Sequence, residues 1–93
     1  MYKRQAYKLN DLKVVEGIGP KIEELLNNAG INTWVELANT SVDRIQSILD
    51  DAGSRYSLAD PSTWPKQADY AAKGEWDKLE EYQDFLDGGR NPS

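Results

Sequence analysis

The sequence predicts an all-α fold, a compact bundle of five or six short helices. Apolar residues recur at helical spacing in several runs, for example at Ile22, Leu25, Leu26 and Ala29. Helix-capping residues precede these runs and glycines follow them. No stretch alternates polar and apolar residues as a half-buried strand does. The length of 93 residues suits one domain with a modest core.

The N-terminal half should contain four helices. The first is expected at 7–14, unless Asn10 or Asp11 caps a shorter helix of a single turn. A tight hairpin at 16–19 leads into a second helix at 20–28, which should end at Gly30. Thr33 and Glu36 form a capping box for a third helix that runs to residue 39. Thr40 or Ser41 should cap the fourth, which ends near Gly53.

The C-terminal half is expected to begin with the longest irregular stretch, at 54–63, where Tyr56 and Leu58 should pack on the core. Two Xaa-Pro steps, at 60–61 and 64–65, predict that a fifth helix begins near residue 63 or 64 and stops at Gly74. Its inward residues are small alanines behind a tryptophan, namely Trp64, Ala68, Ala71 and Ala72.

A sixth helix is expected at 75–87, where Gly88 and Gly89 should end it. Its apolar residues lie at helical spacing: Trp76, Leu79, Tyr82 and Leu86, with Phe85 at the side. The fifth and sixth helices should form a C-terminal helical hairpin. We expect a non-native or disordered leader at 1–6, one domain at 7–88 and a frayed tail at 89–93.

Composition argues against an enzyme. The chain has no histidine, the commonest general base, and no cysteine for a disulfide or a thiolate metal site. No cofactor is expected, and no apolar run is long enough to cross a membrane, so we expect a cytoplasmic protein. The net charge of −5 is unusual for a nucleic-acid binder. However, residues 1–31 hold five basic and four acidic side chains, against six and twelve in 32–93.

The stretch Gly17-Ile18-Gly19-Pro20-Lys21 carries the main functional prediction. Glycine allows close approach to the backbone, and proline is favoured at the first position of a helix. A helix start presents unpaired N–H groups and a partial positive charge, which suit a phosphate. Two glycines flanking an aliphatic residue, followed by Pro-Lys and an Ile/Leu stripe, resemble the helix-hairpin-helix family of nucleic-acid-binding modules.

The resemblance implies that this hairpin holds the phosphate backbone of DNA or RNA without reading bases. Gly17 and Gly19 would supply backbone donors, and Ile18 between them would point inward and staple the helices together. Lys21 would add a cation, with Lys13 as outer support. Such hairpins can also hold a monovalent cation on carbonyl oxygens. Glu16 departs from the expected pattern, because its carboxylate repels phosphate unless it points away.

Most of the chain, 12–90, further resembles a helix-hairpin-helix extension at the C-terminus of a large-subunit ribosomal protein of some bacteria. The matching segments are Gly17–Lys21, 60–68, 74–79 and 87–89. The first residues, Met1–Gln5, instead resemble the translation of a transposase adapter used in sequencing libraries. This predicts a metagenomic reading frame whose natural protein continues upstream.

Two functions remain open at this point. In the first, the monomeric module binds nucleic-acid backbone, ribosomal RNA included, through the hairpin. In the second, the hairpin is only a joint between packed helices, and the acidic C-terminal half docks on a basic protein. A degenerate second hairpin at 48–55 lacks the second glycine and offers Arg55 as its one contact.

Other motifs have simpler structural explanations. Trp34, Trp64 and Trp76 can stack on bases in single-strand binders, but their helical spacing favours core packing. The carboxylate pairs at 50–51 and 80–81 are expected to be solvated surface, because adjacent helical residues do not face one another.

Overall fold

The computed structural model describes residues 11–90, with positions 87–90 described only as part of the last helix. Every regular element within this range is helical, which confirms the predicted all-α class. In order these are η2 (Leu12–Val14), α1 (Pro20–Asn28), α2 (Trp34–Ala38), α3 (Val42–Ala52), α4 (Ser54–Ser57), η3 (Pro61–Thr63), α5 (Trp64–Ala72) and α6 (Trp76–Arg90). No helix in this range is both long and apolar enough to span a membrane.

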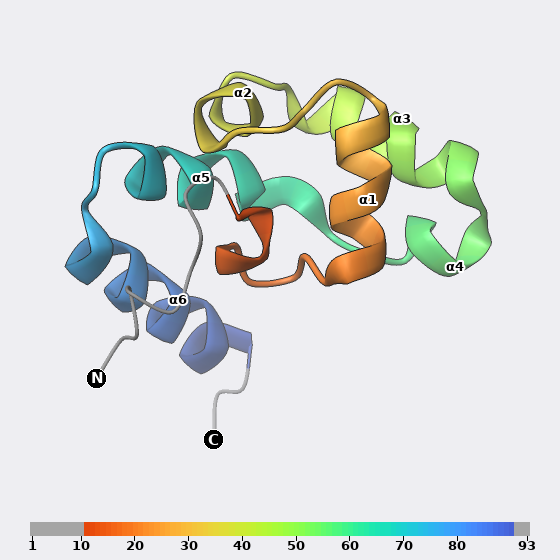
Figure 1. The fold of residues 1–93 in the computed structure, drawn as a ribbon. Helices are drawn as coiled ribbons and strands as arrows, with labels where there is room; N and C mark the ends of the chain where they lie inside the picture. Colours follow the sequence, from red (N-terminus) through yellow and green to blue (C-terminus); the bar gives the residue numbers. More distant parts are fainter. Residues whose placement is uncertain (1–10, 91–93) are drawn as a thin grey trace.

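Helix α5 lies in the middle of the molecule (Figure 1). Helix α2 packs along one side of it and α6 along another, so α5 and α6 form the predicted C-terminal hairpin. Helices α1, α3 and α4 form the end of the molecule that lies away from α6, and α3 contacts both α1 and α4 there. The short turn η2 lies between α5 and α6 in this view and leads through the hairpin into α1.

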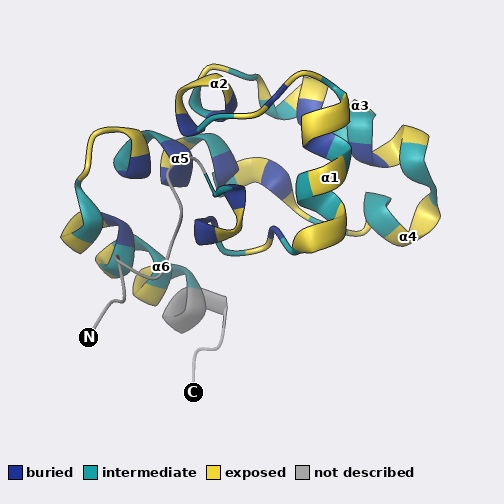
Figure 2. Ribbon diagram, viewed as in Figure 1, coloured by how far each residue is buried: buried dark blue, intermediate teal, exposed yellow. Residues whose placement is uncertain are grey.

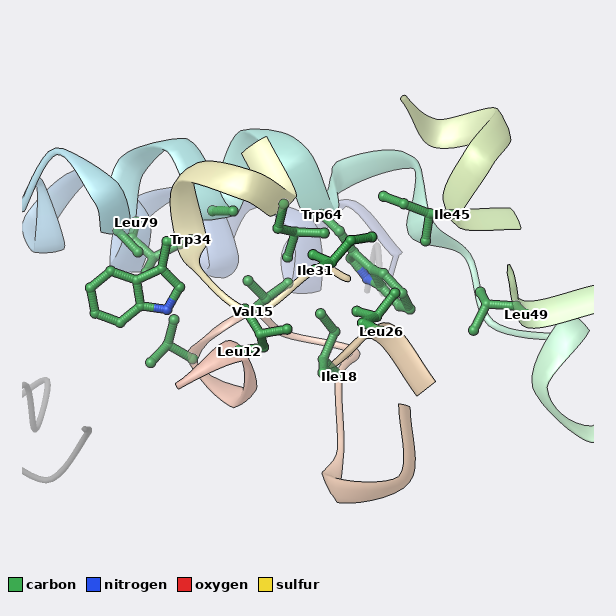
Figure 3. Close-up of a cluster of buried hydrophobic side chains, with 14 residues drawn as sticks. Leu12, Val15, Ile18, Leu26, Ile31, Trp34, Ile45, Leu49, Trp64 and Leu79 are labelled. Carbon is green, nitrogen blue, oxygen red and sulfur yellow. The ribbon is translucent and has the colours of Figure 1, made fainter. Parts of the chain in front are cut away.

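The core follows the predicted apolar stripes and takes a contribution from almost every element (Figures 2 and 3). Its fully buried side chains include Leu12, Leu26, Leu37, Ile45, Leu49, Trp64 and Leu79. Trp34 is also buried, and its indole N–H donates to the Asp11 carbonyl at 2.9 Å. Trp76 packs edge-on against Trp34, with ring centroids 5.3 Å apart. All three tryptophans therefore pack in or against the core, as their helical spacing predicted, and their rings are not displayed for stacking on bases.

Local capping explains where several helices begin and end. Thr33 and Glu36 form the predicted capping box, in which the Thr33 hydroxyl accepts the Glu36 N–H and the Glu36 carboxylate accepts the Thr33 N–H. Ser41, rather than Thr40, caps α3. The α1 helix ends as expected, since the Ile31 N–H folds back to donate to the Leu26 carbonyl.

Removal of the Thr33 cap should be measurable. Thr33→Ala is expected to lower the free energy of unfolding by about 1 kcal/mol, because the Glu36 N–H loses its acceptor. Ser47→Ala, at an exposed site inside α3, is the matched control and should change stability by less than about 0.5 kcal/mol. Urea unfolding monitored by circular dichroism would check this, and equal effects of the two variants would contradict it.

The predicted irregular stretch at 54–63 is wrong, because it contains α4 and η3. Gly53, at a φ of +125°, reverses the chain, and its carbonyl accepts the N–H groups of Tyr56 and Ser57 to start a one-turn helix. Asp60 then caps η3 by accepting the Ser62 N–H. Tyr56 packs on the core as expected, but Leu58 is 87% exposed in the turn after α4.

The predicted ends of the chain also need correction. The described part of the first helix is only the single turn η2, capped by Asp11, while 7–10 lie outside the described residues. Helix α6 continues through Gly88 and Gly89 to Arg90. Glycine ends a helix only when it leaves the helical conformation; otherwise it costs about 1 kcal/mol relative to alanine. Ala72, predicted to face inward, is exposed. The proposed leader and adapter segments lie outside the described range.

Candidate nucleic-acid interface

The hairpin between η2 and α1 is a tight turn whose side chains face the core. The Ile18 N–H donates to the Val15 carbonyl at 3.1 Å, which closes the turn around Glu16 and Gly17. Gly17 occupies the third position of the turn with a φ of +109°, a conformation that side chains strongly disfavour. Val15 and Ile18 are both buried (Figure 3). The turn is therefore anchored in the core at both ends, and within it only Gly17 is exposed.

One side of the turn is pressed against α5. A Cβ atom built on Gly17 would lie 2.7 Å from Trp64 Nε1 and 3.3 Å from Cε2, far inside normal contact. Gly19 differs, because a Cβ there meets nothing within 4 Å and its φ of −99° suits any residue. The two glycines therefore have different roles: Gly17 permits close packing on the indole, whereas Gly19 caps α1.

A buried amide network holds the turn in place. Gln67 on α5 is fully buried, and its Oε1 accepts the Glu16 N–H at 2.8 Å. The same oxygen accepts Nε2 of Gln83 from α6 at 2.8 Å, and that Nε2 also donates to the Val14 carbonyl at 2.9 Å. Gln67 Nε2 donates to the Thr63 hydroxyl at 3.1 Å. Two helices, α5 through Gln67 and α6 through Gln83, thus fix the position of the hairpin backbone.

The outer side of the hairpin presents N–H groups with no acceptor among the described residues. These belong to Gly17, Gly19, Lys21 and Ile22, since the first hydrogen bond of α1 is from the Glu23 N–H to the Gly19 carbonyl. Gly17 and Lys21 are exposed and Gly19 is half-buried. The partial positive charge of the α1 start adds to these donors. This group of amides has the chemistry of an anion site.

Lys13 and Lys21 lie on either side of this backbone in sequence, and both are exposed. Within residues 11–90 neither forms an ion pair, whereas Lys73 and Lys78 on the α5–α6 side are paired with Asp69 and Glu75. The Asp69 carboxylate hydrogen-bonds Lys73 and raises the pKa of that ammonium group. The unpaired ammonium groups of Lys13 and Lys21 are thus available to an external anion.

Acidic groups also lie near the hairpin. The Glu23 carboxylate is directed back to η2, where it accepts the Leu12 N–H at 3.1 Å. Glu16 is half-buried and lines a cavity that Trp64 and Asp60 also line. In the described range no group of three or more His, Cys, Asp or Glu side chains could hold a metal ion.

The predicted site residues fall into two groups. Gly17, Gly19 and Lys21 lie at the accessible backbone of the hairpin and α1, and Lys13 lies on η2 just before it. Ile18 is 5% exposed, so it can contribute to binding only by holding the turn. Sequence reasoning missed the support from Gln67. A signal was present, because Gln67 is a polar residue on the same helical face as Trp64, Ala68 and Ala71.

The second, degenerate hairpin is the reversal between α3 and α4 at Gly53. Its flanking carboxylates, Asp50 and Asp51, are exposed, as is Arg55. Arg55 is the one basic residue of the segment 48–55. Glu81 is exposed and Glu80 half-buried, in keeping with a solvated surface for that pair.

Comparison with known proteins places this geometry in a family. A family model described as the RS2/RL21/YNQ2 HHH domain matches residues 12–72, which include the hairpin, its supporting turn and α5. The chain belongs to this helix-hairpin-helix domain family.

A curated relative agrees with this assignment. This HHH domain is 36% identical over 64 residues to the large ribosomal subunit protein bL21 of Hyphomonas neptunium. The alignment covers 69% of the chain but 31% of the relative, so the chain spans about a third of the length of that protein. No solved structure matches the chain.

Proposed function

We propose that this HHH domain is a non-enzymatic accessory module that holds the phosphate backbone of RNA, ribosomal RNA first, through the hairpin Gly17–Lys21. The observation that carries the proposal is the group of unpartnered N–H donors at the hairpin and α1 start, close in sequence to the unpaired Lys13 and Lys21. The similarity to a ribosomal protein supports RNA over DNA as the natural ligand, and with it a cytoplasmic location.

Such binding would be independent of base sequence. The donors are backbone amides and the cations are lysines, and both recognise phosphate oxygens, which carry no sequence information. The proposed phosphate site comprises only a few residues, and the net charge of −5 repels RNA at long range. The module is therefore expected to bind weakly alone and to act together with other contacts of a larger assembly.

Fluorescence anisotropy with a labelled structured RNA and a DNA duplex, across a salt series, tests the proposal. Affinity should fall with salt, because each neutralised phosphate releases counterions. Lys21→Ala and Lys13→Ala should each weaken binding and lower the salt slope by about one unit. Arg44→Ala is the matched control, because it removes an exposed charge from α3 and gives the same net charge.

Two results would refute the phosphate site. One is the absence of salt-dependent binding at low salt. The other is an equal loss of affinity in Arg44→Ala and Lys21→Ala, which would show that only net charge matters.

A second candidate is a protein-docking module. The observation that favours it is that one side of the hairpin packs on α5 and borders a cavity with an acidic lining. The two surfaces overlap at Gly17, which contributes an N–H group to the phosphate site and also lines the cavity.

A further inference from the structure

A cavity of about 410 Å³ opens beside the hairpin, on its α5 side. This volume is within the range of about 300–1,000 Å³ that is usual for small-ligand sites. Its lining comes from the hairpin, from the η3–α5 junction and from α6. Glu16 and Asp60 are part of this lining, and each is already engaged in other interactions. Recognition of a ligand therefore falls to the remaining residues, among them Gly17, Thr63 and Trp64.

The cavity reaches one nearly buried donor that lacks a partner. Trp64 is only 1% exposed, yet its Nε1–H makes no hydrogen bond with any described residue. Every completely enclosed side-chain nitrogen or oxygen in the described range has a partner, so Nε1 accounts for the small accessible part of Trp64. This atom lies against Gly17, at the edge of the cavity that both residues line. A buried indole N–H normally finds an acceptor, so this donor points to a ligand.

The Thr63 hydroxyl is a second donor in the same lining. Its Oγ1 accepts Nε2 of Gln67 at 3.1 Å, which occupies one lone pair and fixes the side chain. Its hydrogen has no acceptor among the residues that the structure describes. Thr63 is half-buried and directly precedes Trp64, so both donors belong to the η3–α5 junction. Two neutral donors without acceptors indicate a ligand that presents an oxygen atom.

The surroundings of these donors favour a neutral oxygen over a charged one. No described lysine or arginine lines the cavity, so no described cation there would neutralise a phosphate or a carboxylate. Ala59 and Leu86 add apolar contacts to the lining. A ribose matches this combination, because its hydroxyl groups are neutral and sit on a carbon ring. A peptide carbonyl is the alternative source of a neutral oxygen.

Continuity with the phosphate site favours the ribose. Gly17 contributes an N–H group to the proposed phosphate site and also lines the cavity. In an RNA strand each internal phosphate is bonded to a ribose on either side. A strand whose phosphate is held at the hairpin therefore brings a ribose to the mouth of the cavity.

We propose that the cavity binds the ribose next to the phosphate held by the hairpin, and that the 2′-hydroxyl oxygen accepts both the Trp64 Nε1–H and the Thr63 O–H. A hydroxyl oxygen has two lone pairs for these bonds, and its own hydrogen is directed to the open side of the cavity. The 2′-hydroxyl is the group by which a protein distinguishes RNA from DNA. The module would thus select RNA by its sugar without reading bases. This inference rests on the proposed function, because the phosphate site brings the strand to the cavity.

Fluorescence anisotropy with the intact chain and two stem-loops of one sequence tests the proposal. One is RNA, and the other carries 2′-fluorine in place of every 2′-hydroxyl, which keeps the RNA-like helix but leaves a poor acceptor. RNA should bind about three- to tenfold more tightly, because the analogue leaves both donors without a good acceptor. The indole ¹H–¹⁵N signal of Trp64, assigned through its contacts with Gly17, should shift saturably with RNA.

The ratio of the two affinities separates the ribose pocket from the phosphate site. Thr63→Val removes the hydroxyl and should lower the ratio, whereas Thr63→Ser keeps the hydroxyl and should preserve it. Loss of the Gln67 contact in Thr63→Val would weaken both ligands alike, so the ratio is still informative. Lys21→Ala is the matched control, because it removes a phosphate contact and should weaken both ligands equally.

Equal affinity for RNA and its 2′-fluoro analogue, with both weakened by Lys21→Ala, would overturn the ribose pocket and leave the phosphate site intact. A Trp64 signal that RNA does not move would have the same meaning. A Trp64 shift caused by an uncharged capped peptide, but not by RNA, would assign the cavity to a protein partner instead. Absence of RNA binding at low salt would overturn both proposals.

Discussion

Gly17→Ala is expected to lower the free energy of unfolding by about 2–4 kcal/mol. Alanine would have to adopt a φ of +109°, a strained conformation that costs about 1–3 kcal/mol. Its Cβ would also lie 2.7 Å from Trp64 Nε1, and the ring cannot retreat easily because Trp64 is held in the core. Urea unfolding of the variant would measure this.

Gly19→Ala is the matched control, since it makes the same chemical change two residues away. It meets no atom within 4 Å and needs no unusual φ, so its effect should stay within about 1 kcal/mol. Equal destabilisation by the two substitutions would show that the contact with Trp64 is not what makes Gly17 necessary. Because Gly17→Ala disturbs folding, loss of RNA binding in that variant would not identify a phosphate site, and the lysine variants are preferable.

Gln67→Leu is expected to cost about 2–3 kcal/mol of stability, although leucine is more apolar and of similar size. The Glu16 N–H would lose its acceptor, and one hydrogen of the Gln83 amide would be left without a partner. An unsatisfied polar group that is buried costs about 1–3 kcal/mol. Thermal or urea unfolding, followed by tryptophan fluorescence, would measure the loss.

A double-mutant cycle sharpens this prediction. Gln67 and Gln83 share one hydrogen bond, so the double leucine variant should lose less than the sum of the single losses. Gln46→Leu on α3 is the control, because that amide is half-buried and bonds only Asp50 and the Ser57 carbonyl near the surface. Full stability of Gln67→Leu would contradict the role of the network.

The sequence predicted the helices whose boundaries are encoded locally. The limits of α1 follow from Pro20 and Gly30, and the start of α2 follows from the Thr33 capping box. Prediction failed where one local sequence pattern is compatible with two backbone conformations. Asp60 before a proline starts a 3₁₀ turn, although it was expected to belong to a loop. Gly88 and Gly89 lie inside α6, because glycine ends a helix only when it leaves the helical conformation.

The candidate site was likewise only partly predictable from the sequence. The hairpin could be located because glycine, proline and lysine occur within five consecutive residues. Its environment could not, because Glu16 and Gln67 are 51 residues apart in sequence and meet only in the folded chain. The same holds for the cavity, whose lining residues come from three distant segments. Local patterns indicate what a turn can do, whereas long-range packing decides which of its faces stays open.

The hydrogen bond from Gln83 to the Val14 carbonyl has a consequence for the biosynthesis of the protein. Translation proceeds from the N-terminus, so the hairpin leaves the ribosome long before the helix whose amide fixes it. Helices α1 to α5 can assemble as they emerge, and Gln67 on α5 can then accept the Glu16 N–H, but the Val14 carbonyl gains its donor from Gln83 only when α6 has been released. We therefore expect that ribosome-bound nascent chains ending before Gln83 hold this turn through α5 alone, with faster amide hydrogen exchange at Glu16 than in the chain that includes α6.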